Sequence, residues 1–299
     1  MLRMLKGLYP PITTPFLNDG FAAAHLEENL SLWNRQPLDG YVVLGSNGEA
    51  PLLDEAERVE VIETARRAIP PDRRMIVGTG RESTRDTIRA TREAFDLGAD
   101  AVLVGVPTYY RPAMSSAVLE GHFLRVADAS PGPVLLYSVP FFTDIPIEAP
   151  LFERMIRHER IVGIKDSSGD LGSVRALVEA ASATGRTISI LVGSAAVLAG
   201  GLAAGACGGI LAVACVAPRA CAEIARLVAR GDTDAAASLN ALVADLALAV
   251  TKRHGIGGLK AALDLLHFNG GDPRPPLPPA GPEARAEIAG LMARLGLLT

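Results

Sequence analysis

Short apolar runs alternate with longer amphipathic segments along most of the chain. The short runs are rich in Val, Ile and Leu and end in polar or glycine-containing loops, which is typical of buried parallel strands. The longer segments repeat apolar residues every three or four positions, as Leu26, Leu30 and Trp33 do, and this spacing predicts helices that bury one face. The pattern therefore predicts strands that alternate with helices.

Eight strand–helix pairs can be placed in this way. The predicted strands cover residues 8–16, 40–44, 74–79, 101–104, 133–137, 161–164, 187–191 and 209–212. The predicted helices cover residues 22–35, 54–69, 83–97, 115–128, 149–157, 171–184, 195–204 and 218–229. Eight repeats favour a closed α/β barrel, the (β/α)8 TIM barrel. The alternative, a doubly wound open sheet, predicts a glycine-rich nucleotide loop after the first strand, which the sequence lacks.

Strand-like runs stop after residue 231, and the rest of the chain has helical periodicity. A proline-rich connection at 270–279 interrupts it. We therefore expect a catalytic (β/α)8 barrel at 1–231 and a C-terminal helical extension at 232–299 that packs against it. The predicted helices of the extension cover residues 235–252, 258–267 and 282–295.

Composition narrows the class of protein further. Of 299 residues, 49% are hydrophobic and 21% are charged, which is enough to bury a large core. The net charge is −4 and no basic run occurs, so we expect no nucleic-acid or membrane partner. The most apolar stretch, 188–216, is interrupted by six glycines, which argues against a membrane span. Three cysteines without CxxC spacing and no signal-peptide pattern predict free thiols in a reducing cytoplasm.

Lys165 stands at the end of the predicted buried strand 161–164, where a charged side chain is unusual. Burial disfavours the ammonium form, and a neutral amine is a nucleophile toward a carbonyl carbon. The structural alternative is a lysine that extends past the strand end to solvent. Because active sites of (β/α)8 barrels lie at the carboxyl ends of the strands, the position favours a chemical role.

Other polar side chains follow neighbouring strands and should meet Lys165 at one mouth of the barrel. Phenols and hydroxyls there could move the protons that amine attack and carbon–carbon cleavage require. Each also has a structural alternative, as a packed aromatic, a turn residue or an interface tyrosine, but their joint placement favours function. These candidates are Ser46, Asn47, Tyr109, Tyr110, Tyr137 and Ser167.

Other chemistries have weaker support in the sequence. The five histidines lie without metal-ligand spacing, so we predict neither a metal site nor a cofactor. Small residues at 193–194 and 208–209 occupy positions where many barrels bind phosphate. Small residues there also suit close helix packing or a carboxylate, so this alternative stays open.

Six short motifs occur in the order and spacing of a known family and together span essentially the whole chain. With them the chain resembles the pyruvate-dependent class I aldolases of the dihydrodipicolinate synthase/N-acetylneuraminate lyase superfamily. The resemblance implies a TIM barrel, no cofactor and a homotetramer built as a dimer of dimers. The motifs lie at 11–16, 45–49, 78–80, 109–110, 137–140 and 163–166.

The resemblance also implies roles for individual residues. Lys165 would form a Schiff base with the keto carbon of pyruvate or another 2-oxo acid, and Tyr137 would shuttle protons. Ser46 would complete the relay together with Tyr109 donated by a neighbouring subunit. The predicted substrate contacts are Ser46, Asn47, Ser167, Tyr110 and Ile210.

Two features separate members of this superfamily. Dihydrodipicolinate synthases carry an arginine after the tyrosine motif, and residues 140–144 contain none. The segments 111–116 and 250–256 are similar instead to 4-hydroxy-2-oxoglutarate aldolases, which release pyruvate and glyoxylate. Phe141 and Phe142 make this wall more apolar than a second carboxylate would favour. The alternatives are dihydrodipicolinate synthase, another aldolase or dehydratase of the superfamily, and a catalytically idle sensor that binds a 2-oxo acid.

Overall fold

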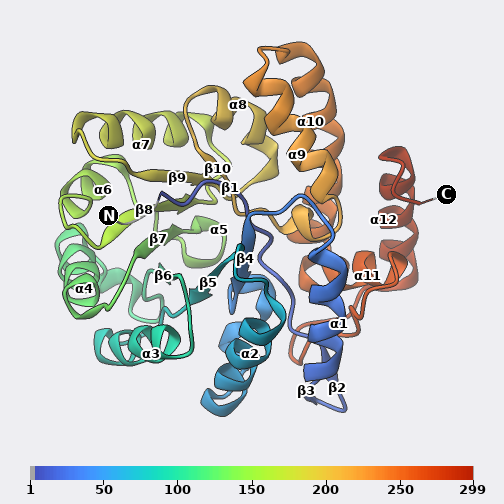
Figure 1. The fold of residues 1–299 in the computed structure, drawn as a ribbon, viewed down its shortest axis with the longest axis horizontal. Coiled ribbons are helices and arrows are strands. Elements are labelled where there is room, and N and C mark those ends of the chain that lie inside the picture. Colours follow the sequence, from blue (N-terminus) through green and yellow to red (C-terminus); the bar gives the residue numbers. More distant parts are fainter. Residues whose placement is uncertain (1–3, 299) are drawn as a thin grey trace.

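Eight parallel strands form a nearly closed barrel in the computed structural model, which describes residues 4–298 (Figure 1). The strands pair in the order β1-β10-β9-β8-β7-β6-β5-β4, and a parallel bridge between Pro11 and Val42 brings the two ends together. The predicted (β/α)8 TIM barrel is thus confirmed. The barrel strands are β1 (Gly7–Leu8), β4 (Gly40–Val43), β5 (Arg74–Gly78), β6 (Ala101–Gly105), β7 (Val134–Ser138), β8 (Ile161–Asp166), β9 (Ser189–Val192) and β10 (Gly208–Gly209).

The predicted first strand, 8–16, is wrong in its extent. Barrel pairing continues past β1 through the N–H groups of Tyr9 and Ile12, which donate to the Gly209 and Val42 carbonyls, and the chain then leaves the barrel to form a small hairpin of β2 (Phe16–Leu17) and β3 (Gly20–Phe21). The prolines between them lack the N–H that a strand ladder requires. The last strand is also shorter than predicted, because the chain turns into a 3₁₀ helix at Ala212–Cys215.

Helices cover the outside of the barrel, and most begin and end within two residues of their predicted bounds (Figure 1). Side-chain caps explain several starts, since Asp54 and Glu57 form a capping box on α2 and Ser83 caps α3. The helices around the barrel are α1 (Ala23–Trp33), α2 (Glu55–Ala68), α3 (Thr84–Asp96), α4 (Ser116–Ala129), α6 (Ala149–Met155), α7 (Leu171–Ala183), α8 (Leu198–Ala203) and α9 (Pro218–Ala229). The short helix α5 (Pro140–Thr143) follows β7 and lies at the strand ends instead (Figure 1).

Two apolar cores stabilise the barrel. One fills the barrel interior with side chains such as Val42, Leu103 and Leu191, and the other lies between the strands and the helices. Gly163 lets β8 approach β9, since a Cβ there would lie 2.0 Å from the Ser189 carbonyl oxygen. Close packing of this kind places the end of β8, and Lys165 with it, at a defined position.

The C-terminal extension packs on the barrel through α10 (Thr233–Leu248), α11 (Gly255–Leu265) and α12 (Pro282–Arg294). A π-helical turn, Ala249–Arg253, joins α10 to α11. The fully buried ammonium of Lys260 on α11 lies 2.7 Å from the carboxylate of Glu49, which follows β4. The extension is therefore joined to the strand ends by a buried ion pair as well as by apolar contacts.

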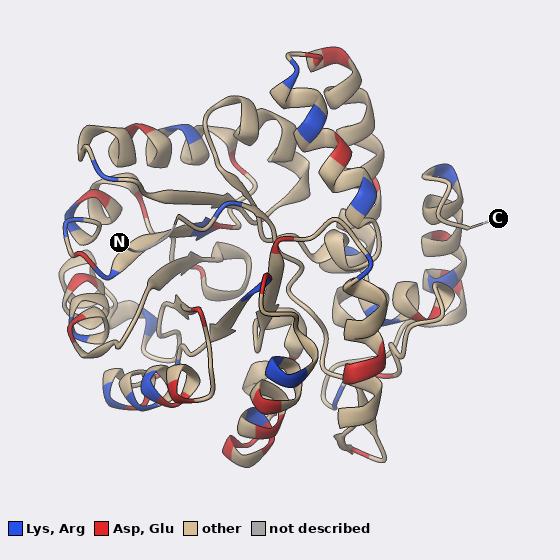
Figure 2. Ribbon diagram, viewed as in Figure 1, with Lys and Arg blue, Asp and Glu red and all other residues tan. Residues whose placement is uncertain are grey.

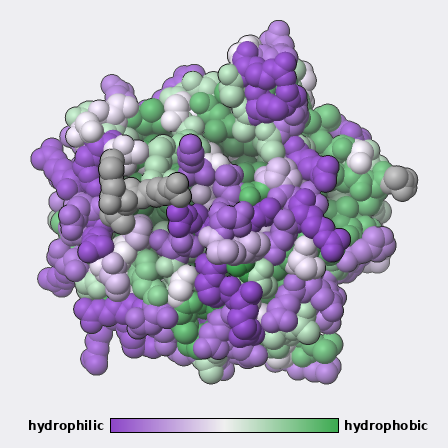
Figure 3. Space-filling view, in the orientation of Figure 1, coloured by the Kyte–Doolittle hydropathy of each residue, from purple (hydrophilic) through white to green (hydrophobic). Residues whose placement is uncertain are grey.

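The helical run Thr233–Arg253 is, within residues 4–298, the one segment long and apolar enough to cross a membrane by length and composition. Core helices of soluble proteins pass the same test, and this run packs against α9, α12 and α8. Charged residues of both signs are spread over the outer helices (Figure 2), and polar residues cover much of the face seen in Figure 3. We therefore interpret this run as a helix that packs within the folded molecule.

Candidate active site

A cavity of about 320 Å³ opens at the carboxyl ends of the strands. Barrel residues after β4, β7, β8, β9 and β10 line one side, and residues of α10, the π-helical turn and α11 line the other. Its size falls in the range of sites for small molecules. The cavity therefore lies where the sequence placed the candidate residues, but the extension supplies a wall that was not predicted.

Lys165 lies at the floor of this cavity. Strand β8 runs to Asp166, two residues further than predicted, so the lysine is held by strand pairing rather than by a loop. Its side chain is only 5% exposed, and its Nζ lies 4.1 Å from the centre of the Tyr137 ring. No carboxylate of residues 4–298 forms an ion pair with it, which leaves the amine facing the cavity.

Tyr137 and Lys165 occupy paired positions on the neighbouring strands β7 and β8. The phenol oxygen of Tyr137 lies 3.4 Å from the Ser46 hydroxyl, at the long limit of a hydrogen bond. Three of the predicted residues, one amine and two hydroxyls, are thus brought together from strands far apart in the sequence. A substrate between them could exchange protons with both oxygens.

The loop after β4 presents Ser46 and Asn47 from a single 3₁₀ turn, Ser46–Gly48. The Asn47 amide donates a 3.4 Å hydrogen bond to the Pro11 carbonyl, and the Thr14 hydroxyl donates a 2.7 Å bond to the Gly48 carbonyl. The segment after β1 therefore holds this loop from below. Both side chains line the cavity, where an amide and a hydroxyl can bind a carboxylate.

Ser167 and Ile210 also line the cavity, and their contact with substrate stays a prediction. Ser167 follows β8 and packs against Gly193, where a Cβ would lie 2.0 Å from the Ser167 hydroxyl oxygen. Ile210 follows β10 and is fully buried. Gly193 and Ser194, considered in the sequence as a phosphate position, form the neighbouring part of the wall.

Tyr109 and Tyr110 do not line the cavity of this chain. They lie on the loop after β6, are 78% and 72% exposed, and pack edge to face with ring centres 5.0 Å apart. The Glu82 carboxylate accepts hydrogen bonds of 2.8 to 2.9 Å from the Tyr109 N–H and from the N–H and hydroxyl of Thr108. The loop is therefore held in place, while the role of Tyr109 in a neighbouring site stays a prediction.

The electrostatic character of the cavity is one-sided. Within the described part of the chain, Lys165 and Lys252 are the charged side chains that line it, and no Asp or Glu does. Asp166 follows Lys165 but accepts a 2.6 Å hydrogen bond from Ser168; burial raises the pKa of this carboxyl, and the bonds from Ser168 oppose that rise. Among the described side chains, two lysines and no carboxylate line the cavity, a composition that favours an anionic ligand.

The remaining side chains with possible reactivity lie elsewhere. The three cysteines are free and do not line the cavity, and burial raises the pKa of the Cys207 thiol to about 11. Among residues 4–298, no group of three or more His, Cys, Asp or Glu side chains is placed to hold a metal ion. The predicted absence of a metal and a cofactor stays an expectation.

Phe141 and Phe142 line the cavity from the short helix α5, in agreement with the wall that the sequence assigned to them. Other residues of the cavity were not predicted from the sequence. Thr251 and Lys252 lie on the π-helical turn of the extension. The similarity of segment 250–256 to 4-hydroxy-2-oxoglutarate aldolases pointed to this stretch, but its helical periodicity did not indicate that it would face the strand ends.

The fold and the cavity define a (β/α)8 barrel with a buried lysine at the centre of a site suited to small anions. The chain belongs to the dihydrodipicolinate synthetase family, whose model matches residues 4–294. The protein is accordingly an enzyme of the aldolase and lyase superfamily to which that family belongs.

The chain is similar to relatives that are named for two different activities. The chain is 32% identical over 297 residues to a 4-hydroxy-tetrahydrodipicolinate synthase of Methanothrix thermoacetophila, covering 99% of both proteins. It is 34% identical over 299 residues to a probable mitochondrial 4-hydroxy-2-oxoglutarate aldolase of Emericella nidulans, covering 95% of this chain and 93% of the relative. The substrate therefore has to be argued from the site itself.

Solved structures agree with the fold over its whole length. The dihydrodipicolinate synthase of Thermotoga maritima superposes with a TM-score of 0.94 at 25% identity, covering 99% of this chain and 100% of the other. The 4-hydroxy-tetrahydrodipicolinate synthase of Methylacidiphilum fumariolicum gives a TM-score of 0.91 at 29% identity, covering 98% and 96%. The likeness includes the extension as well as the barrel.

Proposed function

We propose that the protein is a class I aldolase that cleaves or forms a carbon–carbon bond through a Schiff base between Lys165 and a 2-oxo acid. The observation that carries this proposal is the buried Lys165 amine beside the Tyr137 phenol and the Ser46 hydroxyl. Family membership supports an aldolase or lyase, and the cationic cavity supports an acidic substrate.

The proposed reaction begins when the Lys165 amine attacks the keto carbon and the carbonyl oxygen takes up a proton. The carbinolamine then loses water to give a protonated imine at C2, which takes up the electron pair of the C3–C4 bond as that bond breaks. Removal of the proton from the 4-hydroxyl releases an aldehyde and leaves an enamine. Protonation of the enamine and addition of water release pyruvate and restore the amine. Tyr137 and Ser46 carry these protons, and Ser46, Asn47 and Ser167 hold the 2-oxo acid carboxylate.

We propose 4-hydroxy-2-oxoglutarate as the substrate, cleaved to pyruvate and glyoxylate. The relative in Emericella nidulans and the segments 111–116 and 250–256 support this choice. Reductive trapping tests the chemistry: borohydride with pyruvate should add the mass of one reduced pyruvate to Lys165, and the Lys165→Ala protein should take up none and release no pyruvate. An unmodified wild-type protein would contradict the Schiff-base proposal.

Dihydrodipicolinate synthase is the second candidate, supported by the name of the Methanothrix relative. That reaction adds aspartate semialdehyde, whose carboxylate an arginine after the tyrosine motif would bind bidentately. Residues 140–144 supply no arginine, and the nearby Arg111 pairs with Asp144. A coupled assay with pyruvate and aspartate semialdehyde decides, and we expect little or no product.

A further inference from the structure

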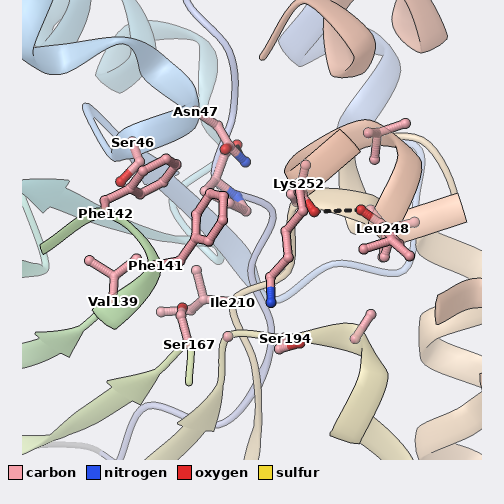
Figure 4. Close-up of a pocket in the computed structure, with 18 of the residues that line it drawn as sticks. Ser46, Asn47, Val139, Phe141, Phe142, Ser167, Ser194, Ile210, Leu248 and Lys252 are labelled. Carbon is pink, nitrogen blue, oxygen red and sulfur yellow. Dashed lines mark hydrogen bonds between the residues drawn. The ribbon is translucent and has the colours of Figure 1, made fainter. Parts of the chain in front are cut away.

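Lys252 is the cation of the cavity that the proposed chemistry does not use. It lies on the π-helical turn Ala249–Arg253, whose i→i−5 bond from the His254 N–H to the Ala249 carbonyl measures 3.0 Å. Turns of this type insert an extra residue into a helix and occur often at functional sites. Figure 4 shows the Lys252 side chain directed from this turn into the cavity.

The neighbours of Lys252 in the sequence are bound elsewhere. Arg253 and His254 both pair with Glu287 on α12, the histidine at 2.8 Å. The Lys252 ammonium forms no ion pair or hydrogen bond with any of residues 4–298, and its Nζ lies 5.5 Å from the centre of the Phe141 ring. It is therefore a free cation over an aromatic face, an arrangement that holds the charge without neutralising it.

Lys252 supplies a positive charge opposite Phe141 and Phe142. These two rings form an apolar wall on α5, which by itself disfavours a second carboxylate. The charge comes from the opposite wall, because α10 and α11 pack over the strand ends. Lys252 is exposed to solvent where it lines the cavity, and its ammonium, unpaired among residues 4–298, can donate hydrogen bonds directly to a carboxylate that reaches this region.

We propose that Lys252 binds the distal carboxylate of a 2-oxo dicarboxylic acid whose keto carbon is held at Lys165. This inference rests on the Schiff-base function proposed above and names its substrate class. The near carboxylate meets the hydroxyls and amide at the strand ends, while the far carboxylate meets an ammonium from the extension. Monocarboxylic 2-oxo acids of the same length lack the second interaction.

Reductive trapping with two matched acids tests this selectivity without any turnover. 2-Oxoglutarate and 2-oxopentanoate have five carbons each and differ in a terminal carboxylate against a methyl group. In the wild-type protein, we expect the concentration that gives half the maximal rate of trapping to be lower for 2-oxoglutarate than for 2-oxopentanoate. Lys252→Met should raise that concentration about tenfold to a hundredfold, the usual worth of a hydrogen bond to a charged group. Trapping of 2-oxopentanoate and of pyruvate should change less than about threefold.

Two further variants separate the charge of Lys252 from its bulk. Lys252→Arg should keep the preference for 2-oxoglutarate, since the charge remains. Arg253→Gln removes a neighbouring charge that is bound to Glu287 outside the cavity, and it should leave the preference as it is. If Lys252→Met weakened the trapping of both acids equally, or of neither, the role of Lys252 would be overturned. Trapping of pyruvate would still support the Schiff base in that case.

The same comparison extends to turnover. Pyruvate release from 4-hydroxy-2-oxoglutarate should fall in Lys252→Met, whereas release from 4-hydroxy-2-oxopentanoate, which has a methyl group in place of the distal carboxylate, should not. A wild-type protein that traps no pyruvate would refute the proposed function itself. A wild-type protein that traps pyruvate but shows no preference for 2-oxoglutarate would refute the role of Lys252 alone.

Discussion

At the scale of residues, the pairing of β7 with β8 brings Tyr137 and Lys165 into contact. Parallel strands place residues at the same height side by side, so the phenol and the amine need no loop to hold them. Ser46 arrives from β4, across the barrel, and closes the set through its 3.4 Å contact with the phenol. The rigid strands therefore define the distances on which proton transfer depends.

Replacing Tyr137 with phenylalanine removes one oxygen and keeps the ring over Lys165. We expect kcat to fall about a hundredfold or more, because general acid–base groups contribute that much, while the free energy of unfolding changes little. Steady-state release of pyruvate measures the effect. Tyr41→Phe is the matched control. The Tyr41 hydroxyl donates a 2.7 Å hydrogen bond to the Asn34 side chain and does not line the cavity, so this substitution should affect stability alone. An unchanged kcat in Tyr137→Phe would show that the phenol does not take part in proton transfer.

At the scale of elements, the buried pair of Glu49 and Lys260 joins the loop after β4 to α11. Glu49 also accepts a 2.7 Å hydrogen bond from the Arg274 N–H, and Lys260 donates to the Asp272 carbonyl at 3.0 Å. Burial lowers the pKa of Lys260, and the Glu49 carboxylate opposes that shift. The loop that carries Ser46 and Asn47 is thereby tied to the extension.

Lys260→Met should lower the free energy of unfolding by about 3–5 kcal/mol, because it leaves the Glu49 carboxylate buried without its partner. Urea unfolding followed by circular dichroism measures the change. Combining Lys260→Met with Glu49→Gln should cost less than the sum of the two single changes, since the double variant removes both charges. Strict additivity would show that the two groups do not interact.

Glu82 connects the loop after β5 to the loop that carries Tyr109. Partial burial raises the pKa of this carboxyl, but the hydrogen bonds from Tyr109 and Thr108 outweigh it and hold the pKa below its usual value. A lowered pKa in the folded protein means that the contribution to stability is present above the ordinary pKa of glutamate and is lost as the pH falls through the lowered one. The protection factors of the amides of residues 108–111, which correct for the pH dependence of intrinsic exchange, should therefore fall in strongly acidic solution and in Glu82→Gln at neutral pH. Equal protection in the wild type and Glu82→Gln would contradict this.

At the scale of the whole molecule, the cavity lies between the barrel and the extension, and one predicted residue lies outside it. Tyr109 is 78% exposed in this chain, an exposure that an interface with a second copy would remove. We propose a homotetramer of two tight dimers in which the partner's loop completes each site. Sedimentation velocity measures the assembly directly.

Co-expression of Lys165→Ala with Tyr109→Phe tests the shared site. If Tyr109 acts across the interface, each mixed dimer has one intact site and one site with both changes. Random pairing makes about half of the dimers mixed, so about a quarter of wild-type activity should return from two nearly inactive proteins. Activity no higher than the average of the two single variants would place Tyr109 within its own subunit's site or outside catalysis.

The sequence by itself determined the barrel and the place of Lys165, because strands, helices and their caps follow from local patterns. The apolar run 161–164, the capping residue Asp54 and the serine and asparagine after β4 are such signals, and the structure bears each of them out. Local pattern failed in the later part of residues 8–16: pairing with the barrel ends at Ile12, and prolines in this segment supply no N–H for a longer ladder.

Only the tertiary structure decided what stands opposite Lys165. Lys252 and the α5 rings approach one another because two helices far apart in the sequence pack over the same strand ends. The partner of Glu49 depends in the same way on how α11 docks against the barrel. Periodicity records which face of a helix is buried, whereas the neighbour of that face is set by the packing of the whole chain.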